Sequence, residues 1–118
     1  MASRIVGFAA LIAAWCTTAA AGDVGGHYRM AGTDTKGVAY AGSADIEMTA
    51  DNTCRITFSD GFSGICMVKG TTLTAAYLVH GKVGLVIYEI SGDGSLQGTF
   101  IDDYHGGGIG RETLTPIR

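Results

Sequence analysis

The chain has 118 residues, of which 47% are hydrophobic, and its formal net charge is -3 at pH 7. This length is enough for one domain with a single core and too short for two. The 8 lysine and arginine residues form no concentrated basic run, so we expect no nucleic-acid partner.

The first 21 residues have the pattern of a secretory signal peptide. A short positive start at Met1–Arg4 is followed by the apolar run Ile5–Trp15 and by the small residues Ala19–Ala21. The run is short for a transmembrane helix, and the polar, turn-prone Gly22 and Asp23 follow at once. We therefore predict cleavage after Ala21 rather than a retained membrane anchor, and a mature chain that is secreted or periplasmic.

The three cysteines divide between this leader and the mature chain. Cys16 leaves with the leader unless it is lipid-modified, an alternative that the large Trp15 before it disfavours. Cys54 and Cys66 remain, an even number in an exported chain, where disulfides persist. Two cysteines with no nearby histidine do not supply a zinc site. We predict a Cys54–Cys66 disulfide, and neither a metal nor a cofactor.

Alternation between apolar and polar residues recurs along the mature chain, and no window shows sustained helical periodicity. The intervening turns are rich in glycine, aspartate and asparagine, which tolerate positive φ. Residues 22–118 are therefore predicted to form an all-β domain, a single antiparallel eight-stranded meander barrel, with a two-sheet sandwich as the alternative. The strands are expected near Gly26–Ala31, Ala39–Thr49, Thr53–Phe58, Phe62–Lys69, Thr72–Val79, Lys82–Ile90, Leu96–Ile101 and Ile109–Pro116.

Hairpin turns fix the register, because paired strands must place their apolar residues on the same face. A three-residue Ser59–Gly61 loop sets Cys54 directly opposite Cys66. Directly opposed residues have Cα atoms about 4.5 to 5.5 Å apart, within the range of a disulfide. A two-residue turn at His80 and Gly81 sets the register of the next hairpin, and there too the apolar residues of both strands fall on the same face of the sheet.

The side chains turned inward are mostly large and apolar, with glycines between them that leave room for neighbouring rings. Because a small barrel filled by aromatic rings has little free volume, we expect no buried small-molecule site. The inward set is Tyr28, Met30, Tyr40, Ile46, Met48, Cys54, Ile56, Phe58, Phe62, Cys66, Val68, Leu73, Tyr77, Val86, Tyr88, Ile90, Leu96, Phe100 and Leu114, with Gly42, Gly64, Gly98 and Gly110.

Glu112 is a candidate buried acid, since the alternation of Gly110 and Leu114 points its carboxylate inward. A buried charge is costly unless it is paired, and perturbed acids mark functional sites. We expect a structural role in which an arginine such as Arg29, or backbone donors, compensate the charge. A functional carboxylate is the alternative.

The segment Asp102–Gly108 combines carboxylates, an imidazole and flexible backbone, features of a calcium or anion loop. A solvated hairpin loop explains the same residues more simply. His27, His80 and His105 fall on separate segments, so no shared metal site is expected. No serine or cysteine nucleophile has a histidine at a recognisable spacing, and we predict no catalytic residues.

Seven outward positions on the middle strands are apolar where the alternation calls for polar residues. The predicted register groups them into one patch, called the outer apolar face: Ile65, Met67, Ala76, Leu78, Val83, Leu85 and Ile87. Contiguous exposed apolar surface indicates an interface. Alternatively a terminal segment, a curved sheet edge or the second layer of a sandwich covers it.

Glycines and aromatic residues recur at short fixed spacings along the mature chain. The segments are Gly26-x-Tyr28-x-Met30-x-Gly32, Gly37-x-x-Tyr40-x-Gly42, Tyr88-x-Ile90, Asp93-Gly94-x-Leu96-x-Gly98-x-Phe100 and Gly108-x-Gly110-x-Glu112-x-Leu114-Thr115-Pro116. Together they resemble a family of small exported bacterial β proteins, most of them uncharacterised and some labelled fibronectin-binding. The resemblance covers nearly all of the mature chain and implies the fold more than an activity. Phe58 and Phe100 stand where tryptophan is expected in that family, and Cys54 and Cys66 are a paired addition to it.

Three functions are compatible with these patterns. We favour a non-enzymatic exported binding or structural domain that uses the outer apolar face for self-association or for a protein partner. The second is an enzyme inhibitor similar to the small disulfide-bonded periplasmic barrels that inhibit lysozyme, with the Tyr104–Gly108 loop inserted into its target. The third is a hydrolytic or metal-dependent activity built on Glu112 and the Asp102–His105 loop.

Overall fold

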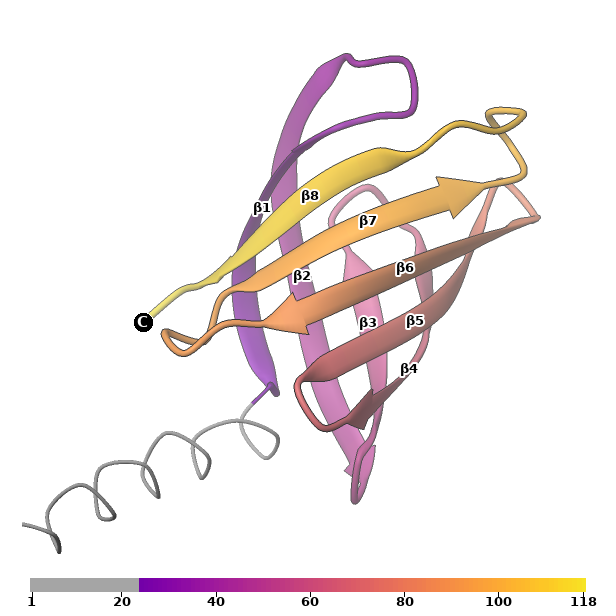
Figure 1. The fold of residues 1–118 in the computed structure, drawn as a ribbon. Helices are drawn as coiled ribbons and strands as arrows, with labels where there is room; N and C mark the ends of the chain where they lie inside the picture. Colours follow the sequence, from indigo (N-terminus) through magenta and orange to yellow (C-terminus); the bar gives the residue numbers. More distant parts are fainter. Residues whose placement is uncertain (1–23) are drawn as a thin grey trace, which may run out of the picture.

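The computed structural model of the protein describes residues 24–118, which form a closed barrel of eight antiparallel strands (Figure 1). Each strand pairs with the next along the chain, and the last pairs with the first, so the predicted meander barrel is confirmed and the sandwich is excluded. The strands are β1 (Gly26–Thr33), β2 (Ala39–Ala50), β3 (Thr53–Phe58), β4 (Ser63–Lys69), β5 (Thr72–Val79), β6 (Lys82–Ile90), β7 (Leu96–Asp102) and β8 (Gly110–Pro116). The predicted signal peptide and Cys16 lie outside the described residues. No helix in the described part of the chain is long and apolar enough to cross a membrane.

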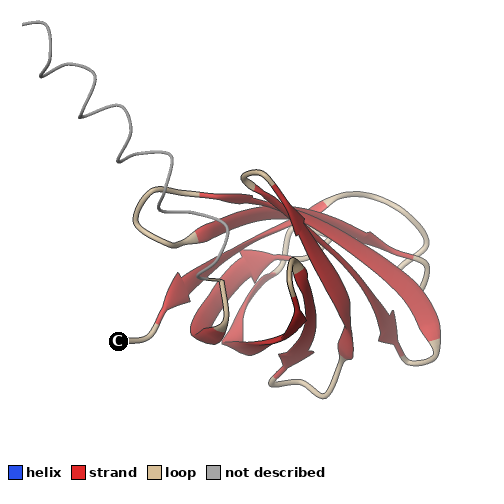
Figure 2. Ribbon diagram, turned by 90° about the horizontal axis from the view of Figure 1, so that it is seen from below, coloured by secondary structure: helices blue, strands red, loops and turns tan. Residues whose placement is uncertain are grey.

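The up-and-down connectivity gives the barrel two different ends (Figures 1 and 2). The connections β1–β2, β3–β4, β5–β6 and β7–β8 lie at one end, called here the mouth. The connections β2–β3, β4–β5 and β6–β7 lie with the C-terminus at the other, called here the terminal end. Both hairpin turns used to set the register have the expected backbone, with positive φ at Gly61, His80 and Gly81.

The predicted register is confirmed at both hairpins. Cys54 lies opposite Cys66 and the two are joined by a disulfide, with their Cα atoms 4.9 Å apart. On the neighbouring pair of strands, Tyr77 lies opposite Gly84. The observed strands differ from the predicted ones only at their ends. The largest difference is in β1, which continues to Thr33 because β8 pairs with it there.

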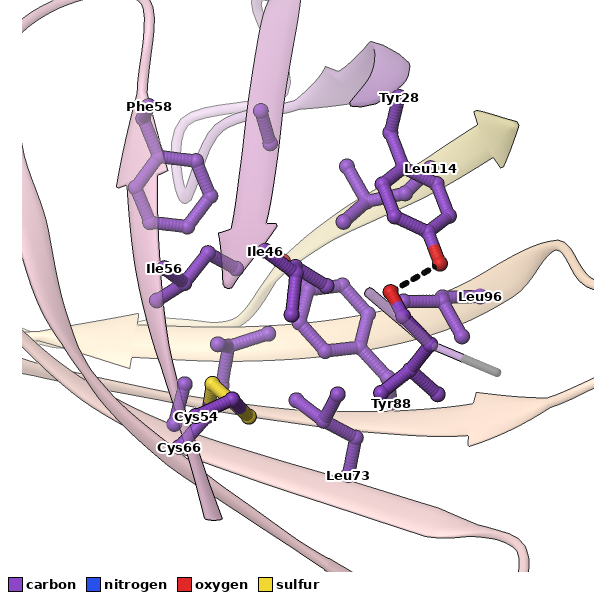
Figure 3. Close-up of a cluster of buried hydrophobic side chains, with 14 of the residues drawn as sticks. Tyr28, Ile46, Cys54, Ile56, Phe58, Cys66, Leu73, Tyr88, Leu96 and Leu114 are labelled. Atoms are coloured by element: carbon purple, nitrogen blue, oxygen red, sulfur yellow. Dashed lines mark hydrogen bonds between the residues drawn. A yellow bond between two sulfur atoms is a disulfide. The ribbon is translucent and has the colours of Figure 1, made fainter. Parts of the chain in front are cut away.

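The buried core runs along the inside of the barrel, and several of its fully buried side chains lie toward the terminal end (Figure 3). Ile56, Leu73 and Leu96 have no exposed surface, and the disulfide packs beside them. Tyr28 also turns into this core, and its hydroxyl donates a hydrogen bond of 2.6 Å to the carbonyl oxygen of Val24. This contact attaches the first described residue to the end of the barrel.

Inward glycines make room for rings from the adjacent strand, as predicted. Tyr77 lies over Gly84, and Tyr88 lies over Gly98, its direct partner across the sheet. A Cβ atom at either glycine would come within 2.5 Å of the ring, closer than side chains can approach. Each ring therefore lies over the neighbouring strand: Tyr88 is fully buried in the core, and Tyr77 lines a space at the mouth.

Candidate functional site

Glu112 lies on β8 at the centre of a symmetrical row of inward residues. Across the sheet the row runs Tyr40, Gly32, Glu112, Gly98 and Tyr88, on strands β2, β1, β8, β7 and β6. The two glycines carry no side chain, so each tyrosine can reach across its glycine toward the carboxylate. Inward alternation on five strands thus assembles one tyrosine–carboxylate–tyrosine group.

The two tyrosines compensate Glu112, which is buried. Tyr40 donates its hydroxyl to the Oε1 atom of Glu112 at 2.6 Å, and Tyr88 donates its hydroxyl to the Oε2 atom. The expectation that an arginine such as Arg29, or backbone donors, would do this is wrong. Arg29 points outward and is exposed, because its neighbours Tyr28 and Met30 occupy the inward positions of β1.

Burial raises the pKa of the Glu112 carboxyl above its ordinary value, and the hydrogen bonds from Tyr40 and Tyr88 oppose this rise. The charge of Asp60, on the β3–β4 connection, adds to it. Burial and the adjacent carboxylate likewise raise the pKa of both tyrosines, so both hydroxyls stay protonated as donors. Burial therefore penalises the charge of Glu112, while the two tyrosine hydroxyls keep the carboxylate hydrogen-bonded.

A cavity of about 300 Å³ opens at the mouth, with Glu112 in its wall. The expectation that packed rings leave little space is therefore wrong for this half of the barrel. The rings lie against the walls, and Tyr40 and Phe62, predicted to be inward, are only half-buried. The aromatic part of the lining consists of Tyr40, Phe58, Phe62, Tyr77, Phe100 and Tyr104.

Four rings form a chain along the rim of this cavity. Phe62 contacts His80 with ring centroids 5.6 Å apart, His80 contacts Tyr104 at 4.6 Å, and Tyr104 contacts His105 at 5.0 Å. These residues belong to three different connections, so their contacts link the hairpin tips of the mouth. Deeper in the cavity, Phe58 and Tyr77 meet edge to face at 5.5 Å.

The Asp102–His105 segment is attached to the end of β7 by hydrogen bonds, although Asp103 and Tyr104 are exposed. Asp102 is buried, and its carboxylate accepts hydrogen bonds of 2.8 Å from both the backbone amide and the Nδ1 atom of His105. Both residues line the cavity, so the structure brings this segment to the same space as Glu112. No group of three or more metal-ligating side chains occurs within residues 24–118.

The three histidines are only partly separated. His80 and His105 both lie at the mouth, where each contacts Tyr104, although they were expected to lie apart. His27 is near the terminal end of β1, where it contacts the exposed Asp45.

Every side chain of the outer apolar face is exposed, as its outward register predicts. The exposed fraction of its large side chains runs from 38% at Leu85 to 62% at Ile65 and Val83. Ile65, Ala76 and Leu85 are consecutive partners across β4, β5 and β6, and Ile101 on β7 extends the row. Sequence reasoning missed Ile101. Residues 24–118 provide neither a second layer nor a segment that covers this face.

The fold and its two surfaces define the class of this protein, an eight-stranded antiparallel barrel with an aromatic cavity at one end and an apolar outer face. Comparison with protein-family models found no family that matches the chain, and comparison with curated proteins found no matching relative. The resemblance to exported β proteins labelled fibronectin-binding therefore stays a prediction.

Proposed function

We propose that this chain is a non-enzymatic exported binding domain, and that its outer apolar face pairs with a second copy of the chain. The observation that carries the proposal is the continuous group of exposed aliphatic side chains on β4, β5 and β6. Export is supported by the leader-like first 21 residues and by the Cys54–Cys66 disulfide, a bond typical of secreted and periplasmic proteins.

The closed barrel restricts how another chain can associate with it. Every strand from β1 to β8 has a hydrogen-bonded neighbour on both sides, so no free edge within residues 24–118 can accept an added strand. Contact must then be made by outward side chains. Monomeric soluble proteins seldom expose a large contiguous apolar patch, and such a patch is typical of an interface.

The chemistry of the face favours a second copy as the occupant. Its centre is aliphatic and carries no charge, so its partner must present a similar apolar surface. Its rim carries both signs of charge, with Arg55 beside Ile65, and with Lys69 and Glu89 in one row across β4, β5 and β6. In a two-fold pair each rim meets an identical rim, and attraction requires both signs on the same surface.

Single lysine substitutions test this pairing. Ile87→Lys and Leu85→Lys each place a charge in the proposed interface, while Ala41→Lys places one on the exposed outer surface of β2, across the barrel. We expect size-exclusion chromatography to show a dimer for the wild type and for Ala41→Lys, and a monomer for both face variants. Their far-UV circular dichroism should remain that of the wild type, because the substituted side chains are exposed.

The proposal is contradicted if Ile87→Lys remains folded and elutes at the same position as the wild-type protein. Unfolding of both face variants would also contradict it, since that would mean that the face is part of a core.

A further inference from the structure

The mouth cavity is a second site, separate from the outer apolar face. We propose that it binds an organic cation, a substituted ammonium group carried on a small apolar body. The cavity volume of about 300 Å³ lies at the lower end of the range for small-molecule sites. Aromatic side chains with a few convergent polar groups are the usual lining of such sites.

With His80 and His105 counted as neutral, the formal charges in the lining have one sign. Asp34, Asp60, Asp102 and Glu112 all line the cavity, whereas no lysine or arginine of residues 24–118 does. A lining of this kind repels an anionic ligand and attracts a cation.

Two of these carboxylates already accept hydrogen bonds from backbone amides of the connections at the mouth. Asp34 accepts hydrogen bonds from the amides of Lys36 and Val38, and Asp102 holds His105. They stabilise their own loops and add negative potential to the cavity without being available as direct ligands.

Asp60 is the lining carboxylate that the protein uses least, and it faces the cavity together with Glu112. Glu112 lies in the wall with both oxygens held by tyrosine hydroxyls, and Asp60 lies at the rim with a long contact of 3.4 Å from the Phe62 amide. Asp60 raises the pKa of Glu112, as expected of two like charges that share one space. A cation between them would relieve that repulsion.

The aromatic lining supplies the second interaction that such a cation needs. Ammonium groups bind to the faces of Tyr and Phe rings, and quaternary ammonium ligands are recognised by cages of several rings. Here Tyr77 and Phe58 form an edge-to-face pair inside the cavity, and Phe62 begins the chain of rings along the rim. Rings and carboxylates in one cavity select a cation over both a neutral and an anionic molecule of the same shape.

Three probes of nearly equal shape distinguish the effect of ligand charge on affinity from the effect of apolar burial. Choline carries a positive charge, 3,3-dimethyl-1-butanol is its uncharged analogue, and 3,3-dimethylbutanoate carries a negative charge. In NMR titrations of the mature domain we expect choline to shift the signals of the cavity residues. We expect its affinity to be at least about tenfold above that of the alcohol, a ratio that corresponds to 1.4 kcal/mol. The carboxylate should not bind measurably.

Variants locate the effect in the cavity. Asp60→Asn and Glu112→Gln should each weaken choline binding several-fold, and Phe62→Leu should weaken it while leaving the alcohol unaffected. Glu47→Gln removes an exposed outward carboxylate on β2 and should change nothing. Asp60 and Phe62 are in a surface connection, so their variants test the site even if Glu112→Gln fails to fold.

The proposal is overturned if the alcohol binds as tightly as choline, if the carboxylate binds best, or if none of the three probes shifts the cavity signals. It is equally overturned if choline binds with the same affinity to Asp60→Asn, Phe62→Leu and the wild type.

Discussion

The two halves of the barrel are built from the same alternating strands but are filled differently. In the terminal half, aliphatic side chains such as Leu73 and Leu96 have no exposed surface, and the disulfide joins the adjacent strands β3 and β4 there. Toward the mouth, rings lie against the walls and leave a cavity with carboxylates in its lining. Glu112, with its two tyrosines, lies at the boundary.

This difference follows from side-chain shape. Leucine and isoleucine fill the terminal half compactly together with the buried Tyr88, whereas Tyr77 lies over Gly84 near the mouth and lines the open space there. The terminal half can therefore supply stability while the mouth keeps space for a ligand. Substitutions in each half and at their boundary test this division.

The two halves should differ most in the free energy of unfolding that is lost when a large side chain is shortened to alanine. Leu96→Ala leaves a cavity in the packed half and should lower the free energy of unfolding by about 2 to 5 kcal/mol. Phe62→Ala removes a larger, half-buried side chain at the rim and should cost about 1 kcal/mol or less. Urea unfolding curves give both values. Equal losses would mean that the mouth is packed as a core.

Loss of the disulfide should have the next largest effect. Replacing Cys54 and Cys66 together by alanine opens a loop with a sequence separation of 12 and should cost about 3 kcal/mol. Thermal unfolding of the oxidised protein and of the double variant measures this loss. Two free thiols in the native, oxidised protein would contradict both the bridge and the register.

The tyrosine hydroxyls on Glu112 should differ in their contribution. Tyr88 is fully buried, so Tyr88→Phe leaves one carboxylate oxygen without a donor where water cannot replace it, at a cost of about 1 to 3 kcal/mol. Tyr40 is half-buried at the mouth, and Tyr40→Phe should cost less because water can take its place. Denaturant unfolding of the two variants gives the order, and a larger loss for Tyr40→Phe would contradict this account of the boundary.

The smallest effect should be a pH dependence that comes from Glu112. Because its pKa in the folded state is raised above the ordinary value of 4.5, the folded protein binds this proton more tightly than the unfolded chain does. Relative to Glu112→Gln, the wild type should therefore gain stability as the pH falls through the raised pKa toward 4.5. Unfolding of both proteins between pH 7 and pH 4.5 measures the difference. A constant difference would mean that burial does not shift the pKa of this carboxyl.

Most of the fold was predictable because local turn chemistry determines the register of each hairpin. The Ser59–Gly61 loop alone places Cys54 opposite Cys66. In a meander each following turn sets the register of the next pair of strands in the same way. Closure of the barrel required one further pairing between residues distant in sequence, β1 with β8. For this pairing no turn is available, and the sandwich therefore stayed open as an alternative.

The site was less predictable for a related reason. Glu112 was expected to be buried, but its partners Tyr40 and Tyr88 are 72 and 24 residues away in sequence, and they meet it only through pairings across five strands. A register carried through β6, β7 and β8 would have placed Gly98 between Glu112 and Tyr88. The cavity had no such signal, because inward aromatic residues give the same pattern whether their rings fill the centre or line the wall.

The mass of the mature wild-type domain in solution tests the proposed function most directly. Multi-angle light scattering over a dilution series should give twice the monomer mass at high concentration, falling toward the monomer mass only on dilution. A monomer at every concentration would contradict pairing through the outer apolar face.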